Sequence, residues 1–333
     1  GDLEGYELVN LMKTVPLLQA LTEQIECHYP EIAGAIVLVN APSALVSIFT
    51  RVVKPFMDPI TAAKVEPSAG VLGSLSGGAN IGGFSSGVRT VNLNYAEVGI
   101  IHLSALHSNY LGGGQNITGE ARQVGRFIPA RFTVNANSPS FRNGPSGSWT
   151  CNFTYLDQDF AFATNPVFTL SAVDSNGNPT RNYGGSFWRY TKSTYLGGRS
   201  YADLTGKATL DAPTLGTVAL AGHTDFNDGQ GTLTVSSERL TYQRATTPVE
   251  PFSGSVNMTL AGNDLVDLDG VCYHPSDSQC NTNDASSNTP QSFTINTIGA
   301  PNMRFGRATM GNATGSELLA LQVLMTMEWF QNG

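Results

Sequence analysis

The sequence is poor in charged side chains. Asp, Glu, Lys and Arg make up 13% of its 333 residues, and 26 acidic residues against 18 basic ones give a net charge of -8. Proteins that bind nucleic acid gather Lys and Arg against the phosphate backbone, and no such cluster occurs in this sequence. The composition therefore excludes nucleic acid as the main partner.

Long apolar runs are also missing. No run approaches the roughly 20 residues of a membrane-spanning helix, and the N-terminus lacks a charged start followed by an apolar signal core. We therefore predict no transmembrane segment. Because Gly1 begins in the middle of a pattern, we expect the chain to be a fragment, and the missing signal core does not bear on the destination of a longer protein.

The residues and motifs of catalysis are sparse. The sequence has five His residues, and it contains no G-x-S-x-G elbow, no P-loop and no H-E-x-x-H motif. Its glycine-rich stretches are not set between a strand and a helix, as phosphate-binding loops are. We therefore predict that the chain is not an enzyme and needs no organic cofactor.

Cysteine is scarce, with four residues in the chain. Cys272 and Cys280 bracket a short polar loop, which favours a local disulfide in an oxidising compartment. The alternative is a zinc site with His274 between the two thiols, but no second Cys or His pair follows at ligand spacing. Cys27 and Cys151 have no evident partners and are interpreted as buried small apolar residues.

Three carboxylates alternate in the segment NDLVDLDG. Asp264, Asp267 and Asp269 precede a glycine, and oxygen ligands at this spacing are able to bind Ca²⁺. An EF-hand loop would need further ligands and a Glu near its end, which the following residues do not supply. A polar hairpin turn is the favoured interpretation, and a calcium site is the alternative.

In residues 1–66 the apolar side chains recur with the periodicity of a helix, except in one continuous apolar run. VPLLQALTEQIECHY places its apolar residues on one helix face, AIVLVN (35–40) is typical of a strand covered on both faces, and SALVSIFTRVVKPFMD predicts a second helix. Helix, strand and helix make a partial α/β unit. Residues 67–88 are dominated by Gly, Ser and Ala and predict a flexible linker.

Residues 89–333 alternate apolar and polar side chains between Gly-, Asn- and Pro-rich turns. Strands are predicted over 130–134, 148–156, 166–174, 208–220, 232–243 and 316–329. Regularly spaced short strands of this kind favour an antiparallel β-sandwich. A tandem pair of sandwiches is the alternative, with a boundary near residues 190–205. The chain is thus expected to be mainly β, preceded by a partial α/β segment.

Five motifs give the N-terminal piece a resemblance to a known family. They are DLEG (2–5), YPE (29–31), VNAP (39–42), VKPFMDP (53–59) and TAAK (61–64). In this order they resemble the second half of a CRAL-TRIO lipid-binding domain. The resemblance implies phospholipid binding, with Glu31 and Lys64 at the inositol headgroup. The alternative is that Glu31 is a capping or surface carboxylate and Lys64 a solvated helix lysine.

The remainder of the chain resembles a different family. YAEVG (95–99), VGRFIPARF (124–132), LSAVDSNGNPTRNYGG (170–185) and RFGRATMGNATGSELLALQV (304–323) are similar to the C-terminal module of the MshQ family of bacterial surface proteins. That family is associated with the biogenesis of the mannose-sensitive haemagglutinin type IV pilus. The resemblance spans about residues 83–333, and its pairing with the first one suggests a fusion of two truncated reading frames.

The two resemblances imply two functions. The MshQ-like part implies an exported, non-enzymatic module in the extracellular space or periplasm, with a structural or adhesive role and with pilus components, other surface components or glycans as partners. The CRAL-TRIO-like part implies lipid or phosphoinositide binding or transfer. We take the first as the leading hypothesis and the second as the alternative.

Overall fold

The computed structural model describes most of the chain after residue 70 and short pieces before it. The described residues are 36–38, 65–67, 71, 73–76, 85–86, 88–108, 112–119, 122–144, 152–224, 229–276 and 278–331. They are mainly β, in several antiparallel sheets, as predicted. They fall into two compact units, of which the first comprises 1–128, 179–187 and 224–229 and the second the rest.

The described part of the first unit consists of short strand pairs. Its strands are β1 (Ile36–Leu38), β2 (Val65–Pro67), β3 (Leu75–Ser76), β4 (Asn94–Tyr95), β5 (Gly99–Leu103), β6 (Leu106–His107), β7 (Ile117–Thr118) and β8 (Arg122–Phe127). β1 confirms the strand predicted within 35–40, and it pairs with β2 in parallel. The helices predicted within 1–66 lie outside the described residues. Antiparallel pairs join β3 to β4, β5 to β8 and β6 to β7.

The described residues of the predicted linker, 67–88, are hydrogen-bonded to residues that follow them in the chain. β3 pairs with β4, and the Gly73 amide donates to the Tyr95 hydroxyl at 3.0 Å. The Val71 amide donates to the Asn182 side-chain oxygen at 2.7 Å, and the Asn182 side-chain nitrogen donates to the Val71 carbonyl at 2.8 Å. The described residues of 67–88 are therefore fixed to the β region and do not behave as a separate linker.

The second unit holds three larger sheets. Its strands are β9 (Arg131–Ala136), β10 (Ser140–Phe141), β11 (Thr154–Tyr155), β12 (Phe160–Thr164), β13 (Val167–Val173), β14 (Ser200–Asp203), β15 (Thr217–Ala221), β16 (Gln230–Ser236), β17 (Arg239–Leu240), β18 (Phe252–Leu260), β19 (Phe293–Arg304), β20 (Gly306–Met310) and β21 (Met325–Trp329). The strand orders of these sheets are β15-β16-β13-β9, β11-β19-β18-β14 and β10-β12-β17. Among the described strands, β20 and β21 form a separate two-stranded sheet.

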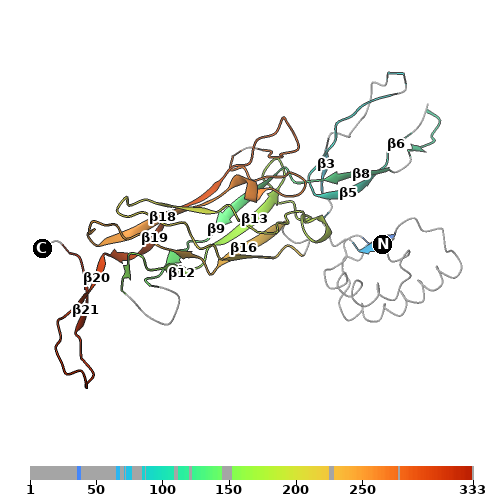
Figure 1. Ribbon diagram of the computed structural model, residues 1–333. Helices are drawn as coiled ribbons and strands as arrows, with labels where there is room; N and C mark the ends of the chain where they lie inside the picture. The colour runs from blue at the N-terminus through green and yellow to red at the C-terminus, as the bar shows by residue number, and fades with distance from the viewer. Residues whose placement is uncertain are drawn as a thin grey trace, which may run out of the picture. The chain divides into compact units, whose positions relative to one another are not determined.

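The strands of this unit bury every second side chain. In β18, Val256, Met258 and Leu260 are each fully buried, and the residues between them are partly exposed. A period of two is expected of a strand with one face on a core. The inner faces of the two four-stranded sheets meet, because the rings of Phe168 on β13 and Phe293 on β19 pack edge to face, 6.1 Å apart. This arrangement is a β-sandwich (Figure 1).

The sandwich runs across the boundary that the sequence suggested near 190–205. β13 lies before that range and pairs with β16 after it, with Val167 opposite Thr234. β14 lies inside the range and pairs with β18. Two tandem sandwiches are therefore not what the described residues form.

The predicted strands are confirmed unevenly. The segments 130–134 and 166–174 correspond to β9 and β13, and 232–243 holds most of β16 and the short β17. In 208–220 the regular strand is confined to β15, and in 316–329 to β21. The described part of 148–156 contributes only the two residues of β11.

Candidate functional site: a disulfide-closed loop on a sheet edge

A tight turn after the 3-10 helix Gly262–Leu265 positions this site. The Asp267 carboxylate accepts hydrogen bonds from the amides of Asp269 and Val271, each at 2.9 Å. Gly270 completes the turn with φ of +83°, and a Cβ there would lie 2.7 Å from the side-chain oxygen of Asn281. The sequence D-x-D-G thus makes a capped turn, because a short carboxylate accepts local amides and glycine tolerates a positive φ.

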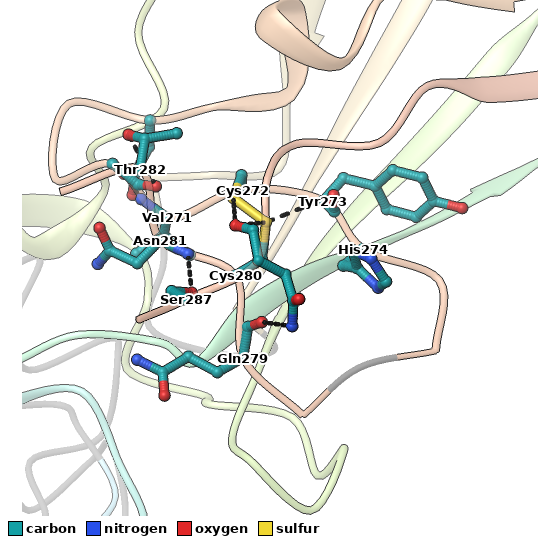
Figure 2. The surroundings of a disulfide bond; sticks show 12 residues. Val271, Cys272, Tyr273, His274, Gln279, Cys280, Asn281, Thr282 and Ser287 are labelled. Carbon is teal, nitrogen blue, oxygen red and sulfur yellow. Dashed lines mark hydrogen bonds between the residues drawn. A yellow bond between two sulfur atoms is a disulfide. The ribbon is translucent and has the colours of Figure 1, made fainter. Parts of the chain in front are cut away.

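The disulfide predicted between Cys272 and Cys280 is confirmed. Their Cα atoms are 5.1 Å apart, and both residues are fully buried. The Cys272 amide also donates to the Cys280 carbonyl at 3.0 Å. Figure 2 shows the bridge at the base of the loop, with His274 and Gln279 on the chain that it closes. Because both sulfurs belong to the disulfide, the zinc alternative with His274 is excluded.

The disulfide-closed loop is bound to the outer edge of β9. The Phe132 amide donates to the Cys272 carbonyl at 2.9 Å, and the Cys280 amide donates to the Ala130 carbonyl at 2.8 Å. Phe132 and Tyr273 form a parallel bridge. The loop therefore occupies the backbone groups that an edge strand would otherwise present for pairing with another chain.

The three carboxylates of the calcium hypothesis have separate local roles. The Asp264 carboxylate accepts from the Gly198 amide at 2.5 Å, and Asp267 caps the turn. Asp269 lies 3.9 Å from the Arg189 guanidinium. No group of three His, Cys, Asp or Glu side chains in the described part of the chain is arranged to hold a metal ion. The structure thus does not bring these three carboxylates together as a calcium site.

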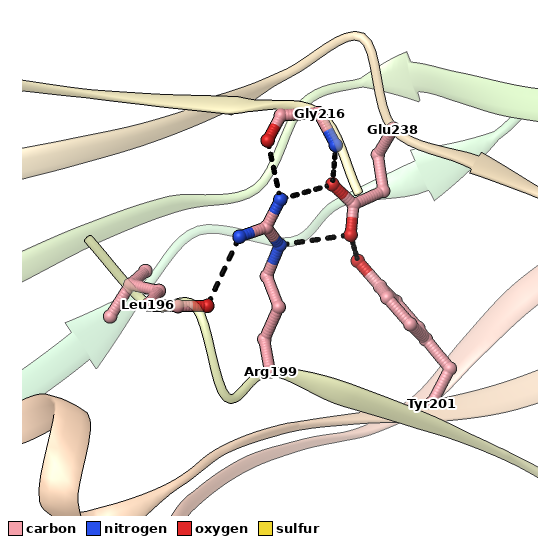
Figure 3. A network of polar contacts seen from close by, with 5 residues as sticks. All are labelled: Leu196, Arg199, Tyr201, Gly216 and Glu238. Carbon is pink, nitrogen blue, oxygen red and sulfur yellow. Dashed lines mark hydrogen bonds and ion pairs between the residues drawn. The ribbon is translucent and has the colours of Figure 1, made fainter. Parts of the chain in front are cut away.

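A buried ion pair in the same unit was not predicted from the sequence. The Arg199 guanidinium donates to both carboxylate oxygens of Glu238, from Nε at 2.9 Å and from Nη2 at 2.7 Å. It also donates to the carbonyls of Leu196 at 3.0 Å and Gly216 at 2.8 Å. The Glu238 carboxylate accepts further hydrogen bonds from the Tyr201 hydroxyl and the Gly216 amide. Figure 3 shows this network, in which a planar guanidinium and a carboxylate bond to each other, to the backbone of Leu196 and Gly216 and to the Tyr201 hydroxyl on β14.

The pKa of the neighbouring Tyr201 phenol is raised. Burial is the largest cause of the upward shift, the negative charge of Glu238 adds to it, and the positive charge of Arg199 opposes it. Both charged groups in this network have a partner, and both side chains are buried. We interpret the network as a structural connection that joins β14 to the residues before β15 and to the residues after β16.

Arg304 contacts two aromatic rings at the base of the hairpin formed by β20 and β21. The Arg304 guanidinium is 4.3 Å from the ring centroid of Phe153 and 4.1 Å from that of Trp329. Arg307 on β20 forms a 2.7 Å ion pair with Glu328 on β21. The Glu97 carboxylate accepts backbone amides, including those of Arg181 and Asn182.

The remaining predicted sites cannot be placed. Glu31 and Lys64, which the CRAL-TRIO resemblance assigns to a headgroup site, lie outside the described residues, as do Cys27 and Cys151. The described residues contain no helix with the length and hydropathy of a membrane span.

Comparison with known proteins gives two family matches. Residues 97–292 match the model of DUF6701, third domain, and residues 1–68 match that of the CRAL/TRIO domain. The second match agrees with the motifs found at the N-terminus. No curated protein and no solved structure matches the chain. Because the first match spans more than half of the sequence and contains both the disulfide-closed loop and the buried ion pair, the chain belongs to the DUF6701 family.

Proposed function

We propose that this chain is a non-enzymatic structural or adhesive module that works outside the cytoplasm, at a cell surface or pilus. The observation that carries the proposal is the Cys272–Cys280 disulfide, which holds a loop against the edge of β9. Disulfides form and persist in oxidising compartments and are rare in the cytosol. A module stabilised in this way is suited to the periplasm or the extracellular space.

The buried polar groups support a structural role. In the described residues, Arg199 and Glu238 bond to each other and to the surrounding backbone, and Asp267 caps its own turn. Catalytic groups, by contrast, sit in clefts with pKa values matched to proton transfer. The resemblance of residues 83–333 to the MshQ family adds a pilus or surface setting, with pilus subunits or surface glycans as the class of partner.

The location is tested by trapping thiols in cells that make the chain with an export signal. We expect Cys272 and Cys280 to resist alkylation until a reductant is added, as read by mass spectrometry of the loop peptide. Recovery of both residues as free thiols from the exported protein would contradict the proposed location. A cytosolic form of the same chain serves as the reduced control.

The adhesive role is tested by co-sedimentation with purified type IV pilus filaments and with polysaccharide-coated beads. We expect saturable binding to one of the two surfaces with no change in the chemistry of either. The matched control is Cys272→Ala/Cys280→Ala, in which the disulfide no longer closes the loop. Absence of binding to both surfaces by the oxidised chain would overturn the adhesive role.

A second function is supported by the match of residues 1–68 to the CRAL/TRIO domain. Under this proposal the N-terminal segment binds a phospholipid, with Glu31 and Lys64 at the headgroup. Native mass spectrometry after incubation with phosphoinositide-containing vesicles should show a one-to-one adduct that Lys64→Ala weakens and Lys54→Ala does not. An unliganded chain in every condition would end this proposal.

A further inference from the structure

Three of the seven methionines lie on one face of the hairpin formed by β20 and β21. Met310 is opposite Met325 in the antiparallel register, and Met327 follows two positions along β21. Because successive side chains of a strand point to opposite sides, these three side chains share a face, which we call the methionine face. The 2.7 Å ion pair between Arg307 and Glu328 lies on the other face.

The same three side chains are the exposed methionines among the described residues. The exposed fractions are 73% for Met310, 59% for Met325 and 58% for Met327. Met258 on β18 and Met303 on β19 are both 0% exposed and belong to the core of the sandwich. The two remaining methionines lie outside the described residues. The described methionines thus divide into an open group on the hairpin and a closed pair in the core.

Met310 and Met325 are close neighbours across the hairpin. The Gly311 amide donates to the Leu324 carbonyl at 2.8 Å, so residues 311 and 324 form a hydrogen-bonded pair. Hydrogen-bonded and non-hydrogen-bonded pairs alternate along an antiparallel ladder, and the side chains of a non-hydrogen-bonded pair are closer together. Met310 and Met325 form a pair of this second kind, so their two thioethers lie next to each other at the same solvent-exposed surface.

We propose that the methionine face is a site of reversible oxidation by peroxides. The thioether sulfur attacks one oxygen of hydrogen peroxide, the O–O bond breaks, and the second oxygen leaves as water after proton transfer. The sulfur is oxidised by two electrons to a sulfoxide, and the peroxide is reduced by the same two electrons. Sulfoxide reductases return the product to methionine, one enzyme for each sulfoxide epimer. This modification is independent of the proposed adhesive role.

Exposure decides which methionines react. Peroxide must reach the sulfur, and a close-packed interior leaves no space for it. Charge also develops on the sulfur and on the departing oxygen, and water stabilises this charge whereas an apolar core does not. Met258 and Met303 therefore stay unoxidised while the sandwich is folded, and the three sulfurs of the methionine face are open to the reagent.

Oxidation changes the surface of the hairpin and leaves the sandwich folded. A thioether is apolar, whereas a sulfoxide is polar and accepts hydrogen bonds. The other face of the hairpin already carries the ion pair of Arg307 and Glu328. After oxidation the hairpin is polar on both faces, and any apolar contact made through the methionine face is weakened. Reduction of the sulfoxides restores the apolar surface.

The first test measures the oxidation rate of each methionine in the full folded chain. Hydrogen peroxide is added, catalase stops the reaction at intervals, and mass spectrometry of the peptides gives the rates. We expect Met310, Met325 and Met327 to react more than about tenfold faster than the two buried methionines. In denaturing urea all these rates should become similar. Hairpin methionines as slow as Met258 and Met303 in the folded chain would overturn the site, and so would equal rates at all five positions.

The second test measures the polarity of the surface by retention on a hydrophobic-interaction column. The control variant, Met310→Leu/Met325→Leu/Met327→Leu, keeps an apolar face that peroxide cannot oxidise. Peroxide should shorten the retention of the wild-type chain and leave that of the variant unchanged. The two sulfoxide reductases should restore the wild-type value. Unchanged retention of the oxidised wild-type chain would contradict the change in polarity. Loss of its near-ultraviolet circular dichroism would show that oxidation unfolds the sandwich, which also overturns the proposal.

Discussion

The guanidinium of Arg199 and the carboxylate of Glu238 form a two-point ion pair with side chains that are 1% and 0% exposed. Removing two charges from water is costly, and the attraction between them offsets that cost only when the remaining donors and acceptors are also bonded. Backbone groups of Leu196 and Gly216 and the hydroxyl of Tyr201 complete the bonding. Each member of this network therefore depends on the others.

Substitution of Glu238 by Gln should destabilise the fold strongly. Loss of one partner leaves the Arg199 charge buried without a counter-ion, which costs roughly 3–5 kcal/mol of unfolding free energy. The matched control is Glu328→Gln in the exposed pair with Arg307, where side chains are 42% and 67% exposed and the loss should stay below about 1 kcal/mol. Urea unfolding followed by circular dichroism measures both. Equal losses in the two variants would show that burial of the first pair is unimportant.

Stability should fall as the pH rises above about 10. Burial, reinforced by nearby acidic side chains, raises the pKa of Tyr190, Tyr201 and Tyr242 well above the ordinary value of 10.0. The folded chain keeps these protons while the unfolded chain releases them, so the stabilisation is complete below pH 10 and is lost above it. The expected slope is about 1.4 kcal/mol per pH unit for each phenol. Tyr201→Phe should lower the slope by one phenol in urea titrations between pH 9 and 12. An unchanged slope would exclude Tyr201 as a contributor.

Gly231 on β16 should not tolerate a methyl group. A Cβ at this position would overlap the Trp188 ring, whose Nε1 donates to the Tyr190 carbonyl at 2.7 Å and so holds the ring in place. We expect Gly231→Ala to cost about 1–3 kcal/mol through overpacking. Gly299 on β19 has no atom within 4 Å of such a Cβ, and Gly299→Ala should leave the melting temperature unchanged or slightly higher. The prediction fails if both variants melt alike.

Reduction of the Cys272–Cys280 disulfide should loosen one sheet edge selectively. The short loop that it closes implies a contribution of roughly 2–3 kcal/mol to unfolding free energy. The Phe132 amide donates to the Cys272 carbonyl, so we expect its hydrogen exchange to accelerate on reduction. The Leu170 amide on β13, inside the same sheet, should stay protected. Uniform acceleration at both positions would indicate global unfolding rather than local release of the loop.

The strands of the sandwich were partly predictable from the sequence. β9 and β13 alternate apolar and polar residues between turn signals, and their predicted positions are confirmed. β18 and β19, the longest strands, were not among the predicted segments. β18 does alternate through Val256, Met258 and Leu260, so a stricter search for period two would have found it. β19 is interrupted by register shifts in its pairing with β18, which blur the pattern.

The site was predictable only where its contacts are local. Cys272 and Cys280 are separated by 8 positions, so a short polar loop between them was enough to indicate the pairing. Arg199 and Glu238 are 39 positions apart, and either side chain alone is typical of a solvated strand end. Both side chains become buried only when the sheets pack together, and the local sequence pattern around each residue carries no information about that packing.

The family match and the structural module have different ends. The match to the third DUF6701 domain stops at residue 292, immediately before β19. That strand pairs with β18 and, in parallel, with β11. Residues 293–304 are thus part of the sandwich, and a fragment cut at the end of the matched region would lack a central strand of one sheet.

The parallel pairing of β11 with β19 sets an order of events during synthesis. Tyr155 lies opposite Arg304, so this sheet stays incomplete until nearly the whole module has left the ribosome. Pairings that join distant parts of a chain form slowly, because the loop must be closed before the contact stabilises it. β11 therefore remains without its parallel partner strand until the residues up to Arg304 have been made.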